Sequence, residues 1–208
     1  MEKIQVKFGD WIEAGFNLYK QNFSTLVLAA IIAFVLASLT VGILLGPLLA
    51  GLVLISLQLF DKTVPSPTVG TIFRGFDFFL NSLLFVVFWG LAVLIGSAIL
   101  NILPGIGQLL ALVFVNVAQT YLMFGMYLIV DQKMNFWPAS LLSINVVKTN
   151  FWHFFGFAVV SGIIGSVGGV LIGIGIVLTL PIQICINAAA YREIFSDLNF
   201  SDHKISPP

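Results

Sequence analysis

The chain has 208 residues, of which 59% are hydrophobic and only 9% are charged. Because a soluble domain is about 25% charged, this composition excludes a water-soluble fold and indicates a membrane protein. Nine Lys and Arg residues balance nine Asp and Glu residues, which excludes nucleic-acid binding, since that needs a net basic face. The single cysteine, Cys185, and two histidines are too few for an intramolecular disulfide or a metal-ligand cluster.

The first segment carries acidic residues where a secretory signal peptide carries only positive charge. These are Glu2, Asp10 and Glu13, and the apolar run that follows is about twice as long as the apolar part of such a signal. We therefore expect this segment to be retained in the mature protein.

Three apolar runs without Asp, Glu, Lys or Arg follow, at 22–60, 78–130 and 149–191. Each is too long for one membrane helix of about 20 residues, and each has helix-ending residues near its middle. The breaks contain Thr40, Gly42, Gly46 and Pro47; Asn101, Pro104, Gly105 and Gly107; and Gly165, Gly168, Gly169, Gly173 and Gly175. The pattern predicts an all-α membrane fold of three helical hairpins, with transmembrane helices at about 23–41, 44–60, 79–101, 107–130, 151–167 and 174–192.

The segment before each hairpin is amphipathic. In the second, Ile72, Phe73 and Phe76 share one helical face, whereas Arg74 and Asp77 lie on the other. Such a segment beside a membrane helix is typical of a helix that lies in the membrane interface. We predict one membrane domain, 1–208, built from three similar units at about 8–62, 68–131 and 136–195, with a short polar tail at 196–208. The third interfacial helix is expected to start at Pro138, a residue suited to a first helical turn.

The first hairpin has little length to spare. Two helices and a turn between Phe23 and Phe60 leave about 17 residues, or roughly 26 Å, for each helix. We therefore expect a shallow hairpin whose turn barely leaves the membrane.

All charged residues lie outside the three hairpins, on the face that both termini share. The basic residues on that face are Lys3, Lys7, Lys20, Lys62, Arg74, Lys133, Lys148, Arg192 and Lys204. Since Lys and Arg in short connections set orientation, we predict a multi-pass protein of the plasma (inner) membrane with both termini cytoplasmic. The acidic residues share that face, so it is neutral overall.

Short stretches at the joins resemble a known group of proteins. The stretches are 15–23 (GFNLYKQNF), 73–76 (FRGF), 139–150 and 190–195 (AYREIF). They resemble the bacterial YciC-like membrane proteins and the membrane domain that is fused to some glycerophosphodiester phosphodiesterases. The resemblance implies a six-helix membrane fold with interfacial helices, and it implies no catalytic residue.

The last helix of each predicted hairpin ends at one charged residue. The three residues are Asp61, Asp131 and Arg192. They are either ordinary cytoplasmic interface residues or a cytoplasmic charge ring in which the two carboxylates meet the arginine around a pseudo-threefold axis. His153, between two aromatic residues, is expected to be interfacial, and Cys185 is expected to be a small core residue.

Neutral polar residues occur inside the second, fourth and sixth predicted helices. They are Gln58, Asn116, Gln119, Thr120, Gln183 and Asn187. In lipid such groups need partners on neighbouring helices, so they are either interhelical contacts or the lining of a narrow polar path. Small residues at Ala29, Ala33 and Ala37 form one face of the first helix, for internal packing or for a subunit interface.

The core lacks ionisable residues, and no nucleophile, base or cofactor motif converges, so we expect neither an enzyme nor a cofactor. The first hypothesis is a structural or regulatory membrane subunit whose partners are the lipid bilayer and either a second copy or another membrane protein. The alternative is a small transporter or channel, including a substrate-capture subunit of an energy-coupling-factor importer. The Ala29, Ala33 and Ala37 face would suit that docking, whereas the bare outer turns do not suit substrate capture.

Overall fold

The computed structural model describes residues 7–170 and 175–197, and the regular structure in these residues is helical throughout. The predicted all-helical fold is therefore confirmed. Lys3, Lys204, the break residue Gly173 and the tail from residue 198 lie outside the described residues.

The helices follow the predicted spans closely. In chain order they are α1 (Phe8–Gln21), α2 (Phe23–Leu39), α3 (Leu45–Phe60), the 3-10 helix η1 (Val69–Phe78), α4 (Phe79–Asn101), α5 (Gly107–Leu122), α6 (Gly125–Asp131), α7 (Phe136–Lys148), α8 (Phe151–Val170) and α9 (Ile176–Asp197). The first turn of α3 already contains Gly46 and Pro47, so the break after α2 is confined to residues 40–44. The third amphipathic helix begins two residues before Pro138.

The core lies where α3, α6 and α9 meet. Leu52 and Ile55 of α3, Leu128 of α6 and Ile186 of α9 are completely buried. The Tyr127 hydroxyl of α6 donates a hydrogen bond of 2.8 Å to the backbone carbonyl of Ile184 in α9. The last helices of the three predicted hairpins thus form the centre of the fold.

Each amphipathic segment packs on the last helix of a different hairpin: α1 on α9, η1 on α3, and α7 on α6. Two of these contacts bring backbones together at glycine. A Cβ at Gly15 would overlap the backbone of Ile186, and a Cβ at Gly75 would overlap the backbone of Pro47 and Gly51. Only glycine permits such close approaches, so these contacts fix where the helices cross.

The second amphipathic segment differs from the expected α-helix. Residues 69–78 form a 3-10 helix that begins with a capping box between Thr68 and Thr71. This segment continues into α4 as one stretch of 33 residues, whereas the α1–α2 and α7–α8 pairs bend by 87° and 111°. Long 3-10 helices are uncommon, and here the close approach of η1 to α3 accompanies the tighter winding.

The fourth predicted span, 107–130, is divided into α5 and α6 by a break at Met123 and Phe124. Ser143 of α7 satisfies backbone groups on both sides of the break. Its hydroxyl donates to the Tyr121 carbonyl at 2.7 Å and accepts from the Phe124 N–H at 3.3 Å. The predicted span is therefore present as one apolar stretch, Gly107–Asp131, and differs from the prediction only in this break, where a side chain from a neighbouring helix replaces the lost intrahelical bonds.

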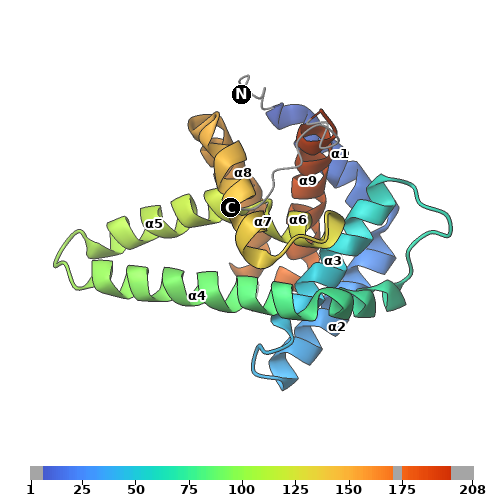
Figure 1. Cartoon of the computed structure of the whole chain (residues 1–208), viewed down its shortest axis with the longest axis horizontal. Helices are drawn as coiled ribbons and strands as arrows, with labels where there is room; N and C mark the ends of the chain where they lie inside the picture. Colours follow the sequence, from blue (N-terminus) through green and yellow to red (C-terminus); the bar gives the residue numbers. More distant parts are fainter. Residues whose placement is uncertain (1–6, 171–174, 198–208) are drawn as a thin grey trace.

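The α4–α5 hairpin extends away from the rest of the fold, with its turn at the far left in Figure 1. By length and composition, two stretches of the described residues could cross a membrane, Val69–Asn101 and Gly107–Asp131, and counting each bent pair as one span raises the number to four. α3 is apolar but shorter. Apolar helices of this kind are the mark of a membrane protein.

Candidate functional site

The structure brings the three charged residues of the predicted ring together at the ends of α3, α6 and α9. The Arg192 guanidinium forms ion pairs with Asp61 at 2.6 Å and with Asp131 at 2.8 Å, one through each terminal nitrogen. Asp131 also accepts hydrogen bonds from the Tyr191 hydroxyl at 2.9 Å and from the Gln132 amide at 2.8 Å. We call Asp61, Asp131, Tyr191 and Arg192 the charge cluster.

The charge cluster is partly shielded from solvent. The side chains of Asp131, Arg192 and Asp61 are 17%, 24% and 37% exposed, so the Asp131 side of the cluster is the better shielded. Because the arginine occupies both carboxylates, the geometry suits a clamp that holds three helix ends together rather than a base that accepts a proton.

A second ionic contact lies beside the cluster and holds α1. Glu193 accepts a hydrogen bond of 2.6 Å from the Trp11 indole and pairs with the Lys7 ammonium at 2.6 Å. Burial opposes the ionisation of Glu193, but the hydrogen bonds from Lys7 and Trp11 outweigh it and lower its pKa. Trp11 itself is buried and packs edge-on against Phe157 of α8.

The predicted neutral polar residues are distributed over separate parts of the fold. On α5, Asn116 donates to the Leu112 carbonyl and the Thr120 hydroxyl donates to the Asn116 carbonyl, so both bonds stay within their own helix. Gln119, also on α5, is exposed. These three residues on α5 therefore form no hydrogen bond, within the described part of the chain, to the polar residues predicted on the other helices.

The other three polar residues lie on α3 and α9. Gln183 packs against Gly165 of α8, and the buried side-chain oxygen of Asn187 has no hydrogen-bond partner among the described residues. Gln58 lines two hollows at the end of α3. The hydrogen bonds of the described residues do not link these side chains into a continuous path.

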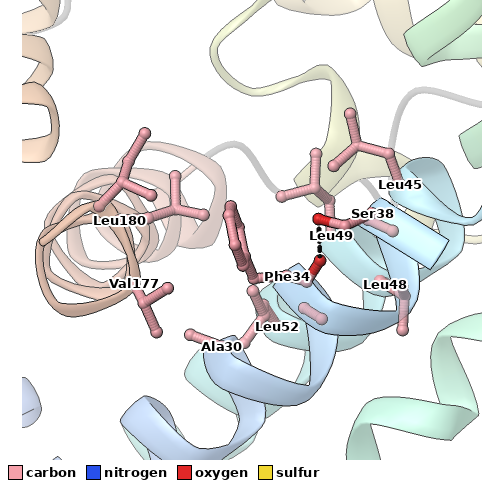
Figure 2. A pocket seen from close by; sticks show the side chains of 12 residues that line it. Ala30, Phe34, Ser38, Leu45, Leu48, Leu49, Leu52, Val177 and Leu180 are labelled. Carbon is pink, nitrogen blue, oxygen red and sulfur yellow. Dashed lines mark hydrogen bonds between the residues drawn. The ribbon is translucent and has the colours of Figure 1, made fainter. Parts of the chain in front are cut away.

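The small-residue face of α2 is buried within the fold. Ala29, Ala33 and Ala37 are buried, and α2 packs against α3 and α9. Beside this face is an apolar cavity of about 250 Å³ between α2, α3 and the start of α9. Figure 2 shows the Phe34 and Leu180 side chains at this cavity, with the Ser38 hydroxyl turned back to bond its own helix. Such a lining suits hydrocarbon rather than a polar solute.

The remaining candidates have local partners. His153 is exposed and its Nδ1 lies 2.6 Å from the Asn150 side-chain oxygen. Cys185 is buried, with its sulfur 3.8 Å from the Ser56 hydroxyl. No group of three or more His, Cys, Asp or Glu side chains that could hold a metal ion occurs in residues 7–170 and 175–197.

Sequence reasoning missed the Trp11–Glu193 contact and the role of Ser143. Both join residues that are distant in the sequence, and neither residue type stands out in its segment. A signal existed for Glu193 alone, because it is the second charged residue after the last apolar run, and the N-terminal segment offers the basic residue Lys7 as a partner.

Comparisons with known proteins add no identification. No protein-family model matches the chain, and neither the curated proteins nor the solved structures contain a match to it.

Proposed function

We propose that the chain is a multi-pass protein of the bacterial inner membrane that acts without catalysis, as a structural or regulatory subunit, through its contacts with lipid and with other membrane proteins. One observation carries the proposal: large apolar side chains are exposed on the α4–α5 hairpin from Leu80 to Val113, although the base of the hairpin packs against α3, α7 and α8. We also propose that it is a relative of the YciC-like proteins, on the strength of the short stretches at its joins.

Exposed apolar side chains occur on both helices of the hairpin and in its turn. Leu94 on α4, Leu109 on α5 and Ile102 at the turn are 65%, 66% and 78% exposed. Monomeric soluble proteins rarely expose contiguous apolar surface of this kind. Lipid or an apolar protein partner can cover such a surface at little free-energy cost, because the surface has no polar group that would be left without a hydrogen bond.

The proposed topology has three units, six spans and both termini in the cytoplasm. The cyclic packing of α1, η1 and α7 on the last helix of another unit supports the repeat. So do the similar ends of α3 and α6: Lys62 comes one residue after Asp61 and Lys133 two residues after Asp131, and both lysines have left-handed φ angles, of 50° and 51°.

The first hairpin of this topology is shallow. Gly46, at the start of α3, packs against the backbone of Ser82 in the first turns of α4. Because α4 begins on the cytoplasmic side in the proposed topology, this contact supports a first hairpin that turns within the membrane.

Single-cysteine labelling tests the topology. In a Cys185→Ala background, a cysteine at Gly105 should react fully with an impermeant thiol reagent from outside the cell, and one at Gln132 only after the membrane is opened. A cysteine at Gly42 should react poorly from either side. Full outside labelling at Gln132, or equal labelling at Gly42 and Gly105, would contradict the proposal.

Fluorescence quenching and transport measurements test the function. A fluorophore at Leu94 in reconstituted protein should be quenched by brominated lipid and not by iodide, whereas a matched fluorophore at exposed Lys148 should show the reverse. Iodide quenching at Leu94 would contradict the membrane placement. Transport of a defined solute into liposomes by the purified protein would overturn a purely structural role, and its loss in Gln119→Leu would assign the role to α5.

A further inference from the structure

A hollow lies between the end of α3, the connection 61–68 and the start of η1. It measures about 330 Å³. The polar residues that line it are Gln58, Thr63, Ser66, Thr68, Thr71 and Arg74. An arginine among four hydroxyl groups and an amide provides a high density of hydrogen-bond donors for its size.

A second hollow of about 470 Å³ adjoins the first. The two share five lining residues, among them Gln58, Thr63 and Ser66, and the lining of the second also contains Lys62. Together their linings contain one lysine and one arginine and, within the described part of the chain, no carboxylate. This basic pair is a local excess of positive charge on a face whose charges balance as a whole.

Arg74 forms no ion pair with Asp61 or Asp77. Asp61 is held by Arg192 at 2.6 Å, and Asp77, one 3-10 turn after Arg74 on the same face of η1, forms no ion pair with it and lines neither hollow. The ion pairs of the described residues do not include Arg74. Its guanidinium therefore keeps the planar, two-pronged set of donors that matches a phosphate group.

The hydroxyl groups leave donors for a ligand. The Thr71 oxygen accepts the Thr68 N–H at 3.1 Å, so its hydrogen remains available, and the Ser66 hydroxyl has no hydrogen bond to another described residue. Hydroxyl and guanidinium donors around one space are suited to an oxyanion with several acceptor oxygens.

The geometry points to a binding site for the phosphate group of a phospholipid headgroup, held by Arg74 and the hydroxyl groups around it, with Lys62 beside the remainder of the headgroup. Exposed apolar side chains, Val64 in the lining of the hollow and Phe73 next to Arg74 in the sequence, favour a lipid over a free phosphate ester. Val64 is 95% exposed and Phe73 is 50% exposed, positions suited to acyl chains at the interface. The lipid source rests on the membrane placement proposed above.

The test titrates purified full-length protein in detergent with dioctanoyl phosphatidylglycerol, followed by native mass spectrometry, with dioctanoylglycerol as the matched ligand that lacks phosphate. Arg74→Gln should weaken phosphatidylglycerol binding by about tenfold or more, Arg74→Lys by less, and Ser66→Ala by a few-fold. Lys148→Gln, which removes an exposed lysine from α7, should leave it unchanged. Wild-type binding should weaken as salt increases.

The outcomes distinguish a lipid headgroup from a soluble phosphate as the ligand, and failure of the site from failure of the proposed function. Displacement of phosphatidylglycerol by millimolar inorganic phosphate or glycerol phosphate would support the phosphate site with a soluble ligand, and failure of displacement would support the lipid headgroup. Equal binding of dioctanoylglycerol, or unchanged binding in both Arg74→Gln and Ser66→Ala, would overturn the site. The quenching measurement at Leu94, repeated in Arg74→Gln, tests membrane placement independently, so a failed site and a failed function remain distinguishable.

Discussion

Replacing Arg192 with Met should destabilise the fold more than the loss of an ordinary surface ion pair does. The substitution keeps the apolar stem of the side chain and removes both ion pairs, at 2.6 Å to Asp61 and 2.8 Å to Asp131. It also leaves two carboxylates facing each other without a cation, so the three helix ends lose their common partner.

The two ion pairs differ in strength because their carboxylates differ in exposure. Asp61 is 37% exposed, so its pair should contribute only about 0.5–1 kcal/mol after screening by solvent. Asp131 is 17% exposed, and a charged hydrogen bond in that setting contributes about 1.5–3 kcal/mol. We therefore expect Arg192→Met to lower the free energy of unfolding by about 2–4 kcal/mol.

A double-mutant cycle identifies the origin of the loss. Asp131→Asn alone should cost about 1.5–3 kcal/mol, but in the Arg192→Met background it removes a carboxylate that no longer has a cation. The double variant should therefore be about 1–2 kcal/mol more stable than the sum of the single effects predicts. Arg192→Lys should fall between wild type and Arg192→Met, because a lysine cannot reach both carboxylates with separate nitrogens.

The measurement is unfolding of purified protein by SDS titration in mixed micelles, followed by tryptophan fluorescence. Additivity of Arg192→Met and Asp131→Asn within about 0.5 kcal/mol would refute the reasoning, because residues that do not interact behave in this way. An Arg192→Met variant as stable as wild type would do the same.

Further substitutions test the packing. Gly75→Ala should destabilise the protein by about 1–3 kcal/mol or more, because its new methyl group overlaps the α3 backbone. The control Gly90→Ala, in open space on α4, should stabilise the protein by about 0.5–1 kcal/mol. Equal thermal unfolding temperatures of the two variants would contradict the close approach of η1 to α3. Ser143→Ala should lower the free energy of unfolding by about 1–3 kcal/mol, because two backbone groups lose their hydrogen-bond partner. The control Ser97→Ala should lower it by less than about 0.5 kcal/mol. An equal loss of stability in the two variants would contradict the bridging role of Ser143. Because the pKa of Glu193 is lowered in the folded state, its stabilising contribution is present above its ordinary pKa of 4.5 and is lost as pH falls through the lower folded value. The difference in stability between wild type and Glu193→Gln should thus narrow on acidification below pH 4.5, and a constant difference would contradict it.

The helix boundaries could be predicted because their causes are local. Uncharged runs are helical, and α2 and α4 begin at the predicted residues. The first two breaks contain Gly42 and Gly105 at positive φ, whereas the predicted break residues Gly165, Gly168 and Gly169 lie inside α8. The break between α5 and α6 depends on Ser143, which lies elsewhere in the chain. The hydrophobic periodicity of residues 107–130 therefore does not predict the break. The 3-10 winding of η1 likewise accompanies a contact with α3.

The candidate sites were predictable to different degrees. The meeting of Asp61, Asp131 and Arg192 follows from one simple idea, that three similar hairpins place the ends of their last helices together. The grouping of the neutral polar residues could not be derived, because residue type gives depth in the membrane but not the direction in which a helix faces its neighbours. Asn116 and Thr120 satisfy their bonds within α5, an outcome that the sequence pattern also permits.

The packing of α1 on α9 has a consequence for the order in which the chain can assemble. Because α1 precedes α9 in the chain, Gly15 and Trp11 meet Ile186 and Glu193 only after α9 has been made. Until then α1 lacks its main packing partner, and the charge cluster lacks its arginine. Synthesis of α9 therefore completes both contacts at once, so a nascent chain stalled before it should expose Trp11 to proteases and quality control.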